Sequence, residues 1–154
     1  QRSETAMNDE LQRMLDERAC ERLITDYTHL VDFGNAPDIA DLFVEDSRWY
    51  TDDMSMDGQV GIREGFTHRQ RVTRRQSRHV CTNMAVTVAG DTAIGLSYLV
   101  NYRHDSETGV AETPAPAGLP KYVGQYHDTF VRTAEGWRIK DRYFVTAFLR
   151  PSSR

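Results

Sequence analysis

The first part of the chain carries apolar residues at helical spacing. They recur every three or four positions with charged residues between them, at Leu11, Met14, Leu15, Cys20, Leu23, Ile24, Tyr27, Leu30 and Val31. This period places them on one face of a helix. Gly34 then suits the left-handed residue that follows many helix ends. The pattern predicts a long amphipathic helix that ends near Gly34 and follows a flexible leader over residues 1–10.

Shorter elements are predicted after this helix. Asn35 and Pro37 suit the start of a second helix, because an Asn side chain can cap it and proline is tolerated in the first turn. Residues 48–51 form an aromatic, β-favouring run and predict a short strand, which the loop 52–61 follows. Residues 62–71 have the pattern of a third helix.

The second half of the chain alternates in the manner of β-strands. Four segments show this pattern: 79–89, 92–102, 122–133 and 137–148. Helices followed by an antiparallel meander predict one α+β domain over residues 11–150, with a tail at 151–154 and with the helices packed on one concave face of a curled sheet. Prolines and glycines in residues 104–120 exclude regular structure and predict a mobile flap there.

Composition narrows the classes of partner. The 154 residues include 19 Lys and Arg against 23 Asp and Glu, a formal net charge of -4, so we expect neither nucleic acid nor an anionic membrane as a partner. No apolar run approaches the roughly 20 residues of a membrane-spanning helix. Cys20 and Cys81 lack the spacing of a metal site. We expect a soluble, cytoplasmic protein without a metal site.

Common cofactor and nucleophile motifs are missing from the sequence. It contains no HExxH, GxGxxG, GxxxxGK or GxSxG pattern, so metalloprotease, dinucleotide, P-loop and serine-hydrolase chemistry lack their usual signatures. If the protein is an enzyme, the remaining route is acid–base chemistry by side chains alone, and we expect no cofactor.

Two residues are candidates for that chemistry, and each has an ordinary structural alternative. Strict alternation groups His79 on one strand face with Cys81, Asn83, Ala85 and Thr87. A lone strand histidine is usually structural, so it needs a partner. Asp32 lies at the unfavourable C-terminal end of the first helix, and the helical period points it away from the apolar stripe, toward solvent.

Other polar residues have two readings as well. Tyr27 and Tyr50 are either core tyrosines or phenols that point into a cavity. Arg142 shares a strand face with Arg138, Lys140 and Phe144 in strict alternation, and it is either solvated or a fixed cation that faces a ligand. Ser97, Leu99 and Asn101 share a face of the second long strand. His127 is a second candidate base.

Several segments together carry a family resemblance. They are Glu21–Tyr27, Val31–Gly34, Leu42–Asp46, Ser77–His79 and Gly136–Ile139. The chain resembles the SnoaL-like branch of the nuclear transport factor 2-like superfamily over nearly its whole length. The resemblance implies a cone-shaped NTF2-like (cystatin-like) fold, in which N-terminal helices pack on a curved, mixed and mainly antiparallel sheet that encloses a pocket.

The resemblance also implies site residues. The chain is similar to scytalone dehydratase, bile acid 7α-dehydratases and hexachlorocyclohexane dehydrochlorinase, in which a helix-end Asp and a strand His form a dyad; Asp32 and His79 match that order. The resemblance implies further catalytic or substrate-binding residues in the expected pocket. They are Tyr27, Tyr50, Arg142, Asn101, Trp49 and His127. Leu99 departs from the scytalone pattern, where a serine is expected.

These matches imply a cofactor-independent lyase of the dehydratase type, with the His/Asp dyad as general base. The expected substrate is a small hydrophobic cyclic molecule such as a polyketide or steroid. A polyketide cyclase, a ketosteroid-type isomerase and a non-catalytic binding or dioxygenase small-subunit-like module stay open. Apolar residues on the outer sheet face favour a homodimer or homotrimer.

Overall fold

The computed structural model describes residues 3–152 and contains helices packed on one six-stranded sheet. Its elements are α1 (Glu4–Asp32), the 3-10 helix η1 (Ala36–Leu42), β1 (Phe43–Tyr50), β2 (Ser55–Asp57), α2 (Gly58–Gln70), β3 (Arg75–Ala89), β4 (Thr92–Asp105), β5 (Tyr122–Thr133) and β6 (Gly136–Leu149). The four long strands predicted from alternation are confirmed. Strand β2 was expected to be loop.

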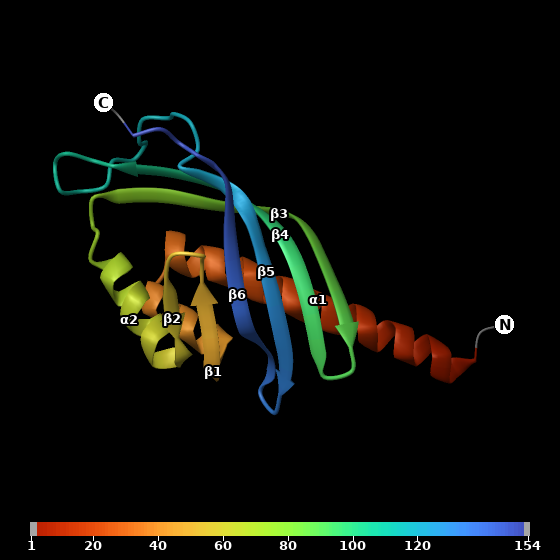
Figure 1. Cartoon of the computed structure of the whole chain (residues 1–154). Coiled ribbons are helices and arrows are strands. Elements are labelled where there is room, and N and C mark those ends of the chain that lie inside the picture. The colour runs from red at the N-terminus through yellow and green to blue at the C-terminus, as the bar shows by residue number, and fades with distance from the viewer. Residues whose placement is uncertain (1–2, 153–154) are drawn as a thin grey trace.

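The sheet is mixed and mainly antiparallel. Its strand order is β2-β1-β6-β5-β4-β3, and β1 pairs in parallel with β6 while all other neighbours are antiparallel. Figure 1 shows the long strands curving over the helices, with α1 crossing beneath the sheet and α2 beside β2 at one end. The predicted α+β class and the curved sheet are therefore confirmed.

Helix α1 starts earlier than its apolar pattern indicated. Ser3 caps it by accepting a hydrogen bond from the Ala6 backbone N–H at 3.2 Å, so most of the predicted leader is helical; residues 1 and 2 lie outside the described part. Met14 and Leu15 were expected to be buried but are more than half exposed. This happens because the N-terminal end of α1 extends past the edge of the sheet (Figure 1).

Two of the β-bulges in the sheet change which of the predicted side chains face inward. On β3, Thr82 pairs with Tyr98 and Ala85 pairs with Leu96, and Asn83 has a left-handed φ of 51°. One extra residue on β3 switches the alternation. Therefore the strict alternation predicted from His79 fails beyond the bulge: Ala85 is exposed, whereas Met84, Val86 and Val88 pack against the core.

The second bulge lies on β6, where Lys140 is the extra residue between the pairs Phe130–Ile139 and Thr129–Asp141. Ile139 and Arg142 are both fully buried as a result. The predicted shared face of Arg138, Lys140 and Arg142 is therefore wrong, because the bulge reverses the alternation between Lys140 and Arg142.

The core lies between the helices and the inner sheet face. Ile24 and Ile39 from the helices meet Phe130 and Ile139 from the sheet, and all four are essentially inaccessible. The outer sheet face leaves Ile94 exposed, together with neighbours such as Val80, Leu96 and Tyr98, and the homo-oligomer stays a prediction. Among residues 3–152, no helix has both the length and the apolar character needed to cross a membrane.

Candidate active site

A cavity of about 790 Å³ lies between the helices and the inner sheet face. Most of its wall is aromatic or apolar, from Tyr27, Val31, Trp49, Met54, Met56, Phe66, Leu99, Tyr122, Tyr126, Phe144 and Leu149. His79 and Asn101 add polar groups. An apolar pocket of this size with a few converging polar groups is the usual form of a small-molecule site.

His79 and Asp32 are in direct contact at this cavity. The His79 Nδ1 lies 2.7 Å from Asp32 Oδ1, and the His79 backbone N–H donates to Asp32 Oδ2 at 2.8 Å. An ionised carboxylate only accepts hydrogen bonds, so this contact places the imidazole proton on Nδ1. The Nε2 atom is then the acceptor, as a general base requires.

The Asp32 carboxylate is buried although it ends helix α1. Its side chain is only 4% exposed, because α1 packs on β3 and stops at Asp32. Besides the two contacts with His79, the Ser77 hydroxyl donates to Oδ1 at 3.0 Å. These donors compensate the negative end of the helix dipole. The prediction that the helical period points Asp32 to solvent is therefore wrong.

The matching family model covers residues 12–143 and describes a SnoaL-like domain. The chain belongs to the SnoaL-like family. The fold expected from the resemblance is thus confirmed. The comparison with curated proteins found no match to this chain.

Solved structures agree with this assignment. An NTF2-like protein with a cystatin-like fold from Novosphingobium aromaticivorans superposes with a TM-score of 0.78 and 26% identity, over 94% of this chain and 90% of that chain. A candidate scytalone dehydratase from the same organism gives 0.75 and 25%, over 92% and 90%. LinA gives 0.71 and 17%, over 94% of both chains. At its lower identity, the likeness to LinA shows the fold alone.

In this SnoaL-like domain, Tyr27 and Trp49 form one wall of the cavity. The Trp49 indole N–H donates to the Tyr27 hydroxyl at 3.1 Å, and the Tyr27 ring packs edge-on against Phe66 with centroids 5.7 Å apart. Burial raises the pKa of Tyr27. The phenol therefore stays neutral around pH 7 and keeps a proton to donate.

Arg142 lies behind this wall rather than in it. Its side chain is fully buried, with the guanidinium 4.2 Å from the Tyr27 ring centroid and 3.6 Å from that of Tyr126. Its Nε lies 3.6 Å from Asp128 Oδ1, which is too long for a hydrogen bond. Burial raises the pKa of Asp128 to about 6, and Arg142 opposes that rise. The sequence left two alternatives for Arg142, a solvated side chain or a cation that faces a ligand in the cavity. The structure excludes both.

Tyr50 and His127 lie on the opposite face of the sheet. Tyr50 stacks on Tyr143 with ring centroids 4.7 Å apart, and His127 packs beside the same ring at 5.9 Å. Both line a separate outer groove and not the cavity. The expectation that Tyr50 and His127 line the cavity is therefore wrong. Each is next in sequence to an inward residue, Trp49 or Asp128, so alternation turns it outward.

Asn101 is buried in the position expected of a cavity amide. It is the cross-strand partner of His79, and its amide donates to the Arg78 carbonyl at 3.3 Å. Ser97, Leu99 and Asn101 are all buried, as their predicted common face requires. Asn101 therefore places an amide next to the candidate base.

Sequence reasoning missed several polar residues of this site, among them Ser77, Arg69 and Arg103. Ser77 holds Asp32, and its hydroxyl oxygen accepts from Arg69 at 2.9 Å; Arg69 and Arg103 line the cavity. Ser77 could have been found by extending the alternation from His79 by one step. The arginines could not, because residues 69–78 look like one solvated basic run, and only strand pairing brings Arg103 to it.

The Pro-rich segment does not cover the cavity. Thr73 donates to the Gly109 carbonyl at 3.1 Å and accepts at its own carbonyl from Ala111 at 3.0 Å. No residue between Ser106 and Pro120 lines the cavity. The predicted flap is therefore tethered beside the α2–β3 connection.

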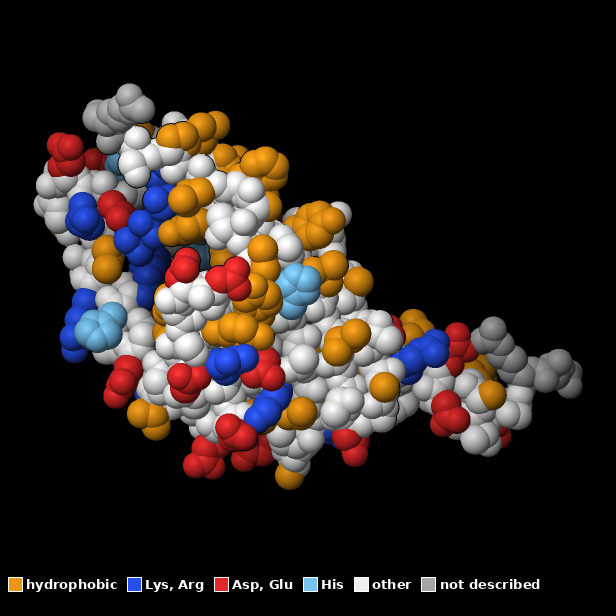
Figure 2. All heavy atoms as spheres, viewed as in Figure 1, with side chains coloured by type: hydrophobic (Ala, Val, Ile, Leu, Met, Phe, Trp, Pro, Cys, Tyr) orange, Lys and Arg blue, Asp and Glu red, His pale blue; other side chains and the backbone are white. Residues whose placement is uncertain are grey.

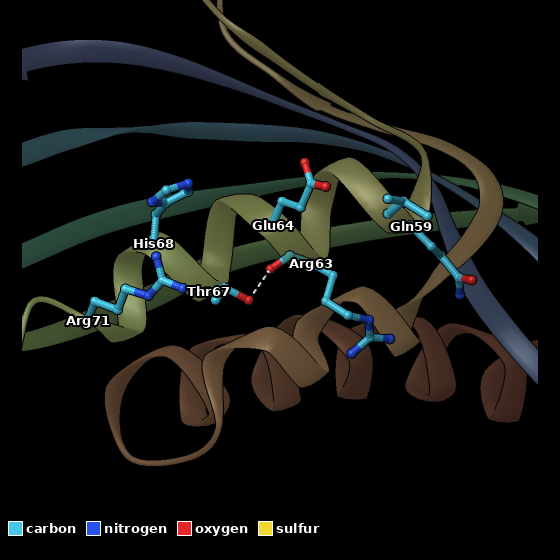
Figure 3. A pocket seen from close by; sticks show the side chains of 7 residues that line it. Gln59, Arg63, Glu64, Thr67, His68 and Arg71 are labelled. Carbon is cyan, nitrogen blue, oxygen red and sulfur yellow. Dashed lines mark hydrogen bonds between the residues drawn. The ribbon is translucent and has the colours of Figure 1, made fainter.

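A shallower groove of about 420 Å³ runs along the exposed side of α2. Figure 3 shows its side chains projecting from successive turns of the helix, with Thr67 bonded to the Arg63 carbonyl. His68 and Glu64 form no hydrogen bond with each other, so this groove lacks a coupled acid and base.

Within residues 3–152, no three His, Cys, Asp or Glu side chains are grouped as a metal ion would need.

Proposed function

We propose that this SnoaL-like protein is a cofactor-independent lyase of the dehydratase type, in which His79 removes a proton from a small hydrophobic cyclic substrate. The observation that carries the proposal is the 2.7 Å contact between His79 and Asp32 at the wall of an apolar cavity of about 790 Å³. The volume and aromatic lining suit a ring system of the polyketide or steroid class.

In the proposed step, Nε2 of His79 takes a proton from the carbon next to a substrate carbonyl. Asp32 stabilises the imidazolium that forms and keeps the ring in the reactive tautomer. A leaving group on the next carbon then departs with its electron pair, and the former C–H electrons form the double bond. A halide leaves as the ion, whereas a hydroxyl group takes the proton from the imidazolium and leaves as water. General base assistance of this kind contributes about 10²–10⁴-fold in rate.

Negative charge on the carbonyl oxygen needs a donor in the cavity. Tyr27 and Asn101 are the two candidates, because both line the cavity and carry N–H or O–H groups. Arg142 contributes through Tyr27: its charge over the Tyr27 ring favours partial negative charge on the phenol oxygen. Tyr50 has no part in this proposal, since it lies outside the cavity.

The same dyad serves an isomerase or cyclase when the proton returns to another carbon or the carbanion closes a ring. The candidate scytalone dehydratase among the similar structures, 25% identical over 92% of this chain, favours elimination. A non-catalytic binding module would have no need for the hydrogen bond between Asp32 and His79.

A substrate panel tests the proposal. Polycyclic ketones, hydroxysteroids and polyketide intermediates are incubated with the protein in deuterium oxide, and mass spectrometry follows deuterium uptake and loss of water. We expect His79→Ala to lose at least 10²-fold in exchange rate while a His127→Ala control on the outer face retains it. Equal rates in both variants, or neither exchange nor loss of water by the wild type on any compound, would contradict the proposal. Exchange without loss of water would favour the isomerase.

A further inference from the structure

One end of the cavity is lined by arginines that the proposed reaction does not use. Arg69, Arg75 and Arg103 all line the cavity, whereas Asp53 is the one carboxylate among its described lining residues. Figure 2 shows Lys and Arg side chains gathered beside a hollow on this face of the molecule. An otherwise apolar cavity thus has a strongly basic end.

Only one of these arginines is fully paired. Arg75 makes two hydrogen bonds to Asp105, at 2.7 and 2.9 Å. Arg103 is 3.9 Å from the same carboxylate, and its side chain donates no hydrogen bond within residues 3–152. Arg69 donates to the neutral Ser77 hydroxyl. Two guanidinium groups therefore have donors left for a further acceptor.

Keeping these cations together has an electrostatic cost. Burial, and then the charge of Arg75, lower the pKa of both Arg69 and Arg103. Arg150 adds to the positive field at Arg103, where Asp105 acts against it. At Arg69, Asp32 and Asp105 only partly offset the lowering of the pKa. Such a cluster of partly buried guanidinium groups is stabilised by an anion that accepts bidentate hydrogen bonds.

The basic end lies next to the candidate base along β3. Arg103 is the cross-strand partner of Ser77, just as Asn101 is the partner of His79. Ser77 and His79 are two residues apart on one strand face, which corresponds to about 7 Å. Arg69, Ser77, Asp32 and His79 form a continuous chain of hydrogen bonds between the two places.

We propose that Arg69 and Arg103 bind an anionic group of the substrate, a carboxylate or phosphate, while His79 deprotonates a carbon of the same molecule. This inference rests on the proposed function and narrows its substrate class to hydrophobic rings that carry an acidic group. The anion fixes the orientation of a ring that the apolar walls alone would leave free to turn.

Three ligands with one ring test this site: naphthalene-2-carboxylate, 2-naphthyl phosphate and the neutral naphthalene-2-methanol, each titrated by calorimetry. We expect at least one anion to bind the wild type about tenfold or more tightly than the alcohol. Arg103→Gln should remove this preference and leave alcohol affinity unchanged. Arg138→Gln is the matched control, because its side chain is 27% exposed against 26% for Arg103 and it lies away from the cavity.

Equal affinity for all three ligands in the wild type, or an anion preference that survives Arg103→Gln, would overturn the proposal. The tighter of the two anions identifies carboxylate or phosphate as the source of the charge. His79→Ala separates the two proposals: if the anion preference persists and proton exchange is also undiminished, the reaction assignment fails while the anion site stands.

Discussion

Helix α1 carries two buried carboxylates that connect it to the sheet in different ways. Asp16 receives two hydrogen bonds from Arg132, at 2.9 and 2.7 Å, and one from the Trp137 indole at 3.0 Å. Asp32, about 24 Å further along the helix axis, receives its bonds from Ser77 and His79. Both acids are satisfied, yet only Asp32 has a partner that faces the cavity.

The difference lies in the partner. Arg132 stays charged at all ordinary pH values, so its pair with Asp16 fixes α1 to the sheet and cannot exchange a proton. An imidazole gains and loses a proton near neutral pH, so the same kind of tether becomes an acid–base pair when one ring nitrogen faces a pocket. One helix thus contributes a structural and a candidate catalytic contact of similar geometry.

Substitutions of Asp32 and Asp16 should differ most in their effect on turnover. Asp32→Asn should lower the proton-exchange rate by about 10²-fold or more, because an amide can donate to Nδ1 and favour the wrong tautomer. Asp16→Asn should leave that rate within about twofold, since Asp16 does not line the cavity. Deuterium exchange of a responsive ketone measures both, and equal losses would mean that the comparison is wrong.

The free energy of unfolding should depend on Asp16. Asp16→Ala leaves the buried Trp137 indole N–H without its acceptor, which costs about 1–3 kcal/mol of unfolding free energy. Urea unfolding followed by tryptophan fluorescence measures this. An Asp9→Ala control on the exposed part of α1 should change it little. A midpoint for Asp16→Ala that equals the control value would disprove a structural role.

The contribution of Asp16 to the free energy of unfolding should be lost only at low pH. The hydrogen bonds from Arg132 hold the pKa of Asp16 well below its usual 3.8. The ionised form is favoured in the folded state, so the stabilisation is complete above pH 3.8 and is lost as the pH falls below it. The stability difference between wild type and Asp16→Asn should therefore be constant from pH 7 to 5 and shrink below 3.8. A difference that disappears near pH 6 would contradict this assignment.

The smallest expected effect is that of removing the Ser77 hydroxyl, which donates a hydrogen bond to Asp32. Ser77→Ala removes one of its hydrogen bonds and the acceptor of Arg69, which should slow proton exchange about two- to tenfold. The pH profile should keep its shape, since Asp32 still holds His79. Ser47→Ala is the control, because Ser47 is also buried but its hydroxyl makes no hydrogen bond within the described residues. A loss as large as that of Asp32→Asn would make Ser77 part of the dyad itself.

The amino-acid sequence by itself determined the helices, the four long strands and the α+β class. These follow from local period and turn residues, which neighbouring positions decide. The resemblance to the SnoaL-like family added the pairing of Asp32 with His79, which no local pattern indicated. The period of the helix even pointed Asp32 the wrong way, because it describes an isolated helix and not one that ends against a strand.

Only the tertiary structure decided which polar side chains share the cavity. The bulges at Asn83 and Lys140 reverse strand faces, so Arg142 is buried behind Tyr27 and not beside its sequence neighbours. Strand pairing sets Arg103 opposite Ser77, across 26 positions of sequence. Such contacts depend on register between distant segments, and a one-residue shift turns every side chain of a strand to the other face.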